Sequence, residues 1–206
     1  MPQYFDNNPD LASKPKYISF TIQERNFSFK SNIGVFSKNQ VDEGTKAFLK
    51  VLLTRPLSGK ILDMGCGYGA LGLTLASFFP QSTFVLADVN ERALELAQEN
   101  QKRLHLENVT CILSNIYENI TDLFHSIVIH PPIRAGKSVI YEMFRGAYEH
   151  LNDDGSLFIV IRKSHGAHSA QAYIEKVFGQ CLLLKKEKGY YIYEAKKENK
   201  NKTREV

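Results

Sequence analysis

The stretch from residue 60 to residue 72 reads Lys60-Ile61-Leu62-Asp63-Met64-Gly65-Cys66-Gly67-Tyr68-Gly69-Ala70-Leu71-Gly72. A short apolar run carries one acid, Asp63, and then breaks into three alternating glycines before a helical pattern begins. This pattern predicts a strand, a tight loop and a helix. Glycines permit positive φ and let a ligand approach the backbone, while the start of the helix offers unpaired N–H groups. We therefore expect the loop to hold a nucleotide-like ligand, and because Asp63 would repel a diphosphate, a neutral or cationic adenosine compound fits better than a dinucleotide.

Strands and helices alternate regularly on the C-terminal side of this loop. Strands are predicted near residues 60–64, 83–87, 109–113, 126–129 and 156–161, and helices near 70–79, 91–104, 139–151 and 169–178. Such alternation predicts a parallel sheet covered by helices on both faces. The last two predicted strands, 181–186 and 190–194, are joined by Glu187-Lys188-Gly189. A connection this short cannot make a parallel crossover, so we expect an α/β fold with a mostly parallel seven-stranded sheet and an antiparallel C-terminal strand.

The N-terminal part precedes this alternation and has a different pattern. Residues 17–22 and 26–31 alternate between apolar and polar side chains around Gln23-Glu24-Arg25, which predicts a β-hairpin. A helix is predicted from Val41 to Leu53, with Thr45 among the residues of its apolar face. We expect one globular domain in three parts. Residues 1–56 form an arm, hairpin and helix packed on the core, residues 57–195 form the core, and residues 196–206 form a disordered basic tail.

Composition excludes several classes of protein. The net charge is +4, but the segment 196–206 contributes +3 of it, so the charge of the remaining chain is weak evidence for an RNA partner. No run of 18 or more apolar residues and no secretory signal is present, which predicts a cytoplasmic protein. The three cysteines and six histidines show no ligand spacing, so no metal site is expected.

Two overlapping patterns describe the glycine loop. Gly67-x-Gly69-x-x-Gly72, with Asp88 about twenty residues further on, satisfies the dinucleotide fingerprint. An acid that ends the first strand before Gly65-x-Gly67 fits the methyltransferase pattern instead. In either case Asp88 would accept hydrogen bonds from ribose hydroxyl groups. The alternative is that the glycines have a purely structural role, as a tight strand-to-helix connection without a ligand.

Residues after the second and third strands extend this predicted cofactor site. Asn115 could bond an adenine amino group, and Val89 and Ile116 would flank the ring. Cys66 is expected to contribute a small side chain and a backbone N–H rather than a reactive thiol.

A second constellation follows the fourth strand of the predicted sheet. It reads His130-Pro131-Pro132-Ile133-Arg134-Ala135-Gly136-Lys137. The ends of the first and fourth strands flank the switch point of a doubly wound sheet, so this segment should face the glycine loop. Successive prolines present carbonyl oxygens rigidly, Ile133 can pack on a flat base, and Arg134 and Lys137 can meet phosphates. The alternative is that the prolines merely end a strand and that the two basic side chains are solvated.

These residues resemble the small-domain class I methyltransferases, particularly short relatives of the ribosomal RNA guanine methyltransferases. The similarity runs from Lys14-Pro15-Lys16 through Gly34-Val35-Phe36-Ser37 and Val41-Asp42-x-Gly44-Thr45 to the proline segment and Lys188-Gly189-Tyr190. The resemblance implies a Rossmann-like fold and contacts to S-adenosylmethionine from Asp63, Gly65, Gly67, Asp88 and Asn115. From the pattern of the residues we also expect Cys66, Gly69, Val89 and Ile116 in this cofactor site. The resemblance also implies that Phe36 and Ser37 lie near the cofactor and the target base.

This chain departs from the family pattern at two positions. The family usually has Asn-Pro-Pro where this chain has His130, and usually Asp at the position of Asn115. An Asn carbonyl can still accept a hydrogen bond, whereas imidazole accepts one only in its neutral form.

Together these features predict an S-adenosylmethionine-dependent methyltransferase that acts on the exocyclic amine of guanine in ribosomal RNA. The expected catalytic residues are His130, Pro131, Pro132 and Ile133. The reaction would be a direct displacement at the sulfonium methyl group. Two alternatives remain open at this point: a non-catalytic RNA-binding or ribosome-assembly module, which His130 favours, and an NAD-linked oxidoreductase, which rests on the overlapping glycine pattern.

Overall fold

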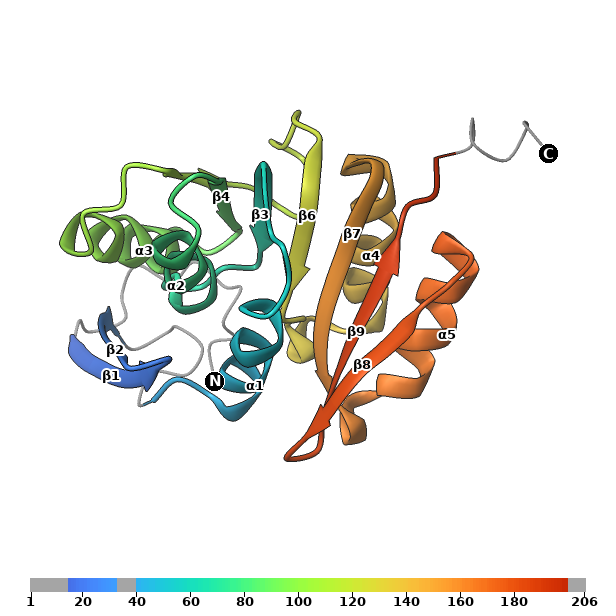
Figure 1. The fold of residues 1–206 in the computed structure, drawn as a ribbon, viewed down its shortest axis with the longest axis horizontal. Coiled ribbons are helices and arrows are strands. Elements are labelled where there is room, and N and C mark those ends of the chain that lie inside the picture. The colour runs from blue at the N-terminus through green and yellow to red at the C-terminus, as the bar shows by residue number, and fades with distance from the viewer. Residues whose placement is uncertain (1–14, 33–39, 200–206) are drawn as a thin grey trace.

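The protein is described by a computed structural model that covers residues 15–32 and 40–199 (Figure 1). Most of the predicted arm, most of the predicted tail, and Phe36 and Ser37 lie outside these residues. The two N-terminal strands, β1 (Lys16–Ile22) and β2 (Arg25–Ser31), pair antiparallel as a separate hairpin. Phe20, Phe27 and Phe29 stack along this hairpin, and Phe27 packs against Phe78 of the core.

The core is one seven-stranded sheet with the order β5-β4-β3-β6-β7-β9-β8. The strands are β3 (Lys60–Met64), β4 (Thr83–Asp88), β5 (Val109–Leu113), β6 (Phe124–Ile129), β7 (Leu151–Arg162), β8 (Leu182–Glu187) and β9 (Tyr190–Lys196). Neighbours from β5 to β7 pair parallel, whereas β9 pairs antiparallel with both β7 and β8. The predicted fold class is therefore confirmed, with the reversed strand lying between β7 and the edge strand β8.

Helices cover both faces of this sheet (Figure 1). The helices α1 (Glu43–Leu52), α2 (Ala70–Phe78) and α3 (Glu91–Arg103) bury apolar side chains on one face, together with the hairpin. The helices α4 (Lys137–His150) and α5 (Ala167–Phe178) cover the other face. Short 3-10 helices, η1 (Ile133–Ala135) and η2 (Lys163–His165), precede α4 and α5. The apolar face predicted for the first helix is confirmed, because Phe48, Leu49 and Leu52 are fully buried.

Element boundaries differ from the predicted ones where the local pattern is ambiguous. β7 begins at Leu151 rather than Ser156, although Asp153, Asp154 and Gly155 are typical of a turn. Backbone hydrogen bonds between this segment and Lys197 hold it beside the end of β9. The predicted three-residue turns are two residues long: Gln23 and Glu24 in the hairpin, and Lys188 and Gly189 between β8 and β9, all with positive φ. Such turns match the twist of paired strands. Within the described part of the chain, every helix is too short or too polar to cross a membrane.

Candidate active site

The two sequence constellations lie side by side at the switch point of the sheet. β3 pairs with β4 on one side and with β6 on the other, and Met64 at the end of β3 stands opposite Ile129 at the end of β6. The glycine loop follows Met64, and His130 follows Ile129. Ligands bind at the carboxyl ends of strands at such a point. The strand order of the sheet therefore brings the glycine loop and the segment after β6 together, as the sequence predicts.

The glycine loop has a backbone that side chains would disturb. Gly65, Gly67 and Gly69 have φ of 78°, 57° and 89°. A Cβ on Gly69 would lie 2.6 Å from Leu73 Cδ1, whereas one on Gly65 would meet only Met143 Cε, at 3.6 Å. The loop is consequently packed against α2 on one side and open at its start, which is the shape of a cradle for a ligand.

Both predicted acids hold this loop in place. Asp63 is buried and accepts a hydrogen bond from Gly72 N at 2.8 Å, while Asp88 Oδ2 accepts one from Gly67 N at 2.8 Å. Asp88 Oδ1 also accepts from Asn90 N at 2.9 Å. Burial raises the pKa of Asp63 to about 7, with a further rise from the nearby charge of Asp88 and an opposing effect of the bond from Gly72. Two buried carboxylates around the cradle suit a cationic ligand better than a diphosphate.

The other predicted cofactor residues lie near the ends of β4 and β5. Ser114 N donates to Asp88 O, which joins these two strand ends. Asn115 is exposed and Ile116, with φ of 52°, is half buried; both line a hollow of about 370 Å³ that Tyr117 and residues of α4 complete. Val89 is also half buried. Burial raises the pKa of the Cys66 thiol well above its usual value, which keeps the thiol protonated and supports its predicted packing role.

The segment after β6 turns sharply into η1. Pro132 O accepts a hydrogen bond from Ala135 N at 2.9 Å, which starts the turn. The structure gives Pro131 O no hydrogen-bond donor among residues 15–32 and 40–199. Ile133 is half buried and packs against the core beneath α4 and α5, and Arg134 is exposed. The carbonyl oxygen of Pro131 is thus an available acceptor at the strand end.

His130 is held by residues that sequence analysis did not place in the site. Its Nδ1 lies 3.1 Å from Thr45 Oγ1 and 3.9 Å from Asp42 Oδ2, and its ring meets the Tyr190 ring edge-on, 6.3 Å between centroids. Burial lowers the pKa of His130, while the charge of Asp42 acts in the opposite direction. The lower pKa supports the neutral form that an acceptor role requires. A polar Thr45 on an otherwise apolar helix face was the available signal for this contact.

Basic side chains lie at the carboxyl edge of the sheet. Arg134 and Lys137 are exposed, and the Lys137 ammonium lies 5.1 Å from the centre of the Tyr141 ring. The guanidinium of Arg162, at the end of β7, lies 5.8 Å from the centre of the Tyr190 ring, and Lys163 follows it. These cations lie at the same edge of the sheet as the cradle, where they can meet a phosphate backbone.

Comparison with known proteins finds relatives of about the same length as this chain and relatives about twice as long. An uncharacterised protein of Bacillus subtilis, YbxB, is 42% identical over 196 residues, which cover 94% of this chain and 98% of the relative. The ribosomal RNA small subunit methyltransferase C of Vibrio parahaemolyticus is 32% identical over 189 residues, covering 88% of this chain and 53% of the relative. The chain therefore spans about half the length of this named enzyme.

A solved structure resembles the fold closely. The 16S rRNA N2 G1207 methyltransferase of T. Thermophilus, in complex with AdoMet and guanosine, superposes with a TM-score of 0.82 at 26% identity over 92% of this chain and 52% of that one. The sequence profile of the methyltransferase small domain matches residues 26–194, which include nearly all of β2, the glycine loop and the proline segment. The chain belongs to the methyltransferase small domain family.

Proposed function

We propose that this protein uses S-adenosylmethionine to methylate the exocyclic amine of a guanine in ribosomal RNA. The observation that carries the proposal is the pairing of β3 with β6, which places the glycine cradle beside His130 and Pro131. A cofactor cradle and two hydrogen-bond acceptors at adjacent strand ends suit transfer between two bound reactants. A guanine substrate is supported by the guanosine in the related T. Thermophilus complex.

The cofactor would occupy the space above the glycine loop. Gly65, Cys66, Gly67 and Gly69 form its floor, and Asp63 and Asp88 supply negative charge beneath it. Asn115 would bond the adenine amino group, and Val89 and Ile116 would flank the adenine ring. S-adenosylmethionine, when bound, supplies an electrophilic methyl group on a positively charged sulfur.

The protein residues would act by positioning the amine. His130 and the Pro131 carbonyl accept its N–H groups, Pro132 fixes the turn, and Ile133 packs on the base. This positioning would aim the nitrogen lone pair at the methyl group that S-adenosylmethionine would supply, and the proton that the amine gives up would pass to solvent. Arg134 and Lys137 would bind phosphates, and a base from a paired region would have to be flipped out.

Methyl incorporation from labelled S-adenosylmethionine tests this proposal. The substrates are unmodified ribosomal RNA and the small ribosomal particle, and nuclease digestion then identifies the methylated nucleoside. We expect N2-methylguanosine at one position. Methyl groups on another base or atom would overturn the guanine assignment while leaving the transferase assignment intact.

A non-catalytic RNA-binding or assembly module is the second candidate, because His130 replaces the family's usual Asn. Binding of S-adenosylhomocysteine together with failure to methylate any ribosomal RNA or particle would favour it. The dinucleotide alternative predicts that NADH, rather than S-adenosylhomocysteine, raises the melting temperature. The family assignment weighs against that alternative. A ribosomal RNA substrate agrees with the cytoplasmic location expected from the sequence.

A further inference from the structure

The connection from β5 to β6 crosses the sheet without a helix of its own. β4 and β3 lie between these two strands, and a parallel crossover of this kind usually carries a helix that packs on the sheet. Residues 114–123, all of which the structure describes, form turns and no helix; we call them the crossover loop. Asn115 and Ile116, the residues proposed to meet the adenine, stand at its start. The position of the adenine site therefore depends on what holds this loop.

Tyr117 attaches the crossover loop to α4. Its Oη donates a hydrogen bond to Met143 O at 3.0 Å. A Cβ on Gly146 would lie 2.4 Å from Cδ2 and 2.5 Å from Cε2 of the Tyr117 ring, so the ring occupies the space that any side chain at position 146 would need. Burial raises the pKa of Tyr117, which keeps the phenol protonated as a donor. Glycine inside a helix is unfavourable relative to alanine, and the contact with this ring accounts for its presence in α4.

His150, the last residue of α4, covers the other side of the Tyr117 ring. The two rings stack with 4.4 Å between their centroids and 16° between their planes. His150 Nδ1 lies 2.8 Å from Gly146 O, and Nε2 lies 3.1 Å from Ile120 O of the crossover loop. Carbonyl oxygens accept, so each ring nitrogen that carries a proton donates there. The Tyr117 ring is thus enclosed between Gly146 and His150, and the loop contacts α4 at both Tyr117 and Ile120.

The backbone of Ile116 needs such support. Its φ of 52° is left-handed, a conformation that costs free energy for a β-branched residue and persists only where the surroundings impose it. Ser114 Oγ donates to Ile116 O at 2.8 Å and accepts from Asn119 N at 3.1 Å, which holds the loop from within. Tyr117 is the next residue, so its attachment to α4 fixes the chain directly after the strained position.

We propose that Tyr117, Gly146 and His150 are positioning residues, which hold Asn115 and Ile116 in the conformation that receives the adenine of S-adenosylmethionine. The adenine part of this inference rests on the proposed function; the attachment of the loop to α4 does not. A loop that is already held in its binding conformation loses less conformational freedom when the ligand binds, which increases the affinity. α4 begins directly after the proline segment, so one helix supports both the cofactor side and the acceptor side of the site.

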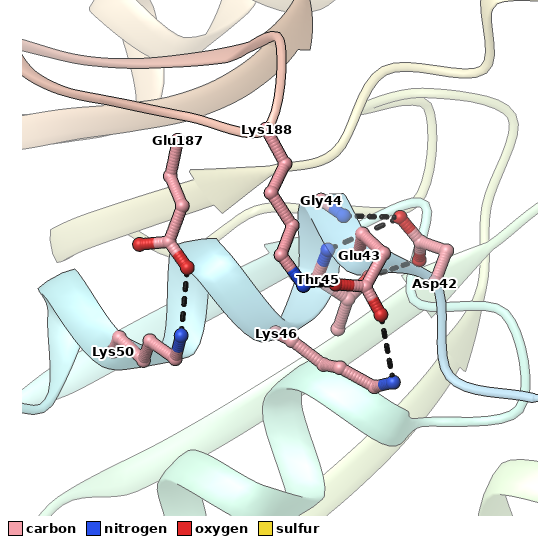
Figure 2. A network of polar contacts seen from close by, with 8 residues as sticks. All are labelled: Asp42, Glu43, Gly44, Thr45, Lys46, Lys50, Glu187 and Lys188. Carbon is pink, nitrogen blue, oxygen red and sulfur yellow. Dashed lines mark hydrogen bonds and ion pairs between the residues drawn. The ribbon is translucent and has the colours of Figure 1, made fainter.

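The start of α1, on the acceptor side, has a separate support (Figure 2). Lys188, in the turn between β8 and β9, pairs with Glu43, and Lys50 Nζ donates to Glu187 Oε1 at 2.6 Å. Both pairs attach α1 to that turn. They share no residue with the contacts of Tyr117, so each support can be altered without altering the other.

Hydrogen exchange of the full-length protein without cofactor or RNA tests the attachment. The amides of Glu118 and Ile120 donate within the crossover loop and should be protected in the wild type. Tyr117→Phe removes one hydroxyl and keeps the ring, and should make both amides exchange about three- to tenfold faster while the strands of the sheet are unchanged. Tyr141→Phe is the matched control, because it removes a hydrogen bond from another tyrosine of α4, to Ser169 O at 3.1 Å. Its loop amides should exchange as in the wild type.

Calorimetry with S-adenosylhomocysteine tests the positioning role. Tyr117→Phe should weaken binding about three- to tenfold, as expected for one hydrogen bond. Gly146→Ala should weaken it by about tenfold or more, although alanine favours the helix, because the Tyr117 ring has to leave its place. Tyr141→Phe and Lys50→Gln should keep the wild-type affinity. In methyl transfer the loss should fall on KM for S-adenosylmethionine, with kcat within about twofold of the wild type.

The outcomes separate this inference from the proposed function. Wild-type affinity in Tyr117→Phe, or weaker binding accompanied by equally faster exchange throughout the sheet, would overturn the positioning role. If Gly146→Ala does not fold, Tyr117→Phe decides alone. Absence of methylation with every RNA would refute the proposed function and leave the exchange and binding results standing.

Discussion

At the scale of single residues, the site combines two buried acids with one half-buried base, and each of them makes specific hydrogen bonds. Asp88 holds the glycine loop by accepting from Gly67 N, Asp63 accepts from Gly72 N in the first turn of α2, and His130 is held by Thr45. A carboxyl group can accept these hydrogen bonds whether or not it is protonated, whereas an imidazole can accept a hydrogen bond only when it is neutral. The pH dependence of stability and of turnover should therefore arise from different residues.

His130 should control the acid limb of turnover. Its pKa in the folded protein lies below 6.5, and imidazolium has no acceptor nitrogen, so methyl transfer should fall as pH drops through that lowered pKa. His130→Asn, whose carbonyl accepts at every pH, should transfer methyl groups without this acid limb. The measurement is kcat against pH for both proteins. A limb that is the same in the Asn variant would argue against the acceptor role.

Asp63 should make the free energy of unfolding depend on pH. Its pKa rises from 3.8 in a model peptide to about 7 in the fold, so between these values the folded state binds more protons than the unfolded state. The free energy of unfolding should decrease as pH rises across that window, by up to about 4 kcal/mol. Asp63→Asn keeps an acceptor for Gly72 N and should lose this part of the pH dependence. Urea unfolding at several pH values measures the free energy of unfolding of the wild type and of the variant. The same pH dependence in both proteins would contradict the prediction.

Gly69 should be essential for the shape of the cradle. Gly69→Ala places a Cβ at positive φ and 2.6 Å from Leu73 Cδ1, while Gly189→Ala meets nothing within 4 Å at a φ of +79°. Both variants incur the cost of a left-handed alanine, about 1 kcal/mol, and only the first adds a steric clash. We expect Gly69→Ala to be the less stable by about 1–3 kcal/mol and to lose affinity for S-adenosylhomocysteine, measured by urea unfolding and calorimetry. Equal losses in the two variants would count against this.

At the scale of elements, the local pattern determined most of what the structure contains. The alternation of apolar strands and amphipathic helices predicts the sheet and both helical layers. The reason is that buried elements show a regular spacing of apolar residues in the sequence. The contact between His130 and the first helix could not be predicted, since it joins residues 85 positions apart through packing. The early start of β7 also depends on a distant segment, because residues 154 and 155 bond Lys197 beyond β9. The hairpin turn is one residue shorter than predicted because Arg25 pairs with Ile22.

One such distant link is the attachment of the hairpin. Asn100 of α3 is fully buried, donates to Lys30 O at 2.9 Å and Tyr68 O at 3.0 Å, and accepts from Lys30 N at 2.7 Å. It thereby joins β2 to the glycine loop. Asn100→Ala leaves these backbone groups without their partner and should cost about 2–4 kcal/mol. Urea unfolding and faster hydrogen exchange of β2 amides would show it. Asn26→Ala, at an exposed bond on the same hairpin, serves as the control and should change little.

At the scale of the whole molecule, charge is placed unevenly around a nearly neutral body. Arg134 and Lys137 lie at the carboxyl edge of the sheet beside the cradle, whereas Lys102 and Lys176 are exposed in the last turns of α3 and α5. An RNA whose base reached His130 would run close to Arg134 and Lys137. The second pair is a matched control of the same charge.

Salt dependence should distinguish these pairs. Neutralising Arg134 and Lys137 to Gln should reduce the slope of log affinity against log salt by up to about two, because each phosphate contact releases roughly one counterion. The corresponding Lys102 and Lys176 double variant should keep the wild-type slope. Filter binding of ribosomal RNA at several salt concentrations measures both. The same slope in all three proteins would place the RNA elsewhere.

The position of β9 between β7 and β8 has a consequence for synthesis on the ribosome. β8 is made before β9, yet its pairing partner in the sheet is β9, so β8 stays unpaired until residues 190–196 have emerged. Tyr190 and the turn that anchors α1 arrive with the same segment. A nascent chain can therefore assemble its cofactor cradle from β3 to β6 early, while the surroundings of His130 are completed among the last contacts of folding.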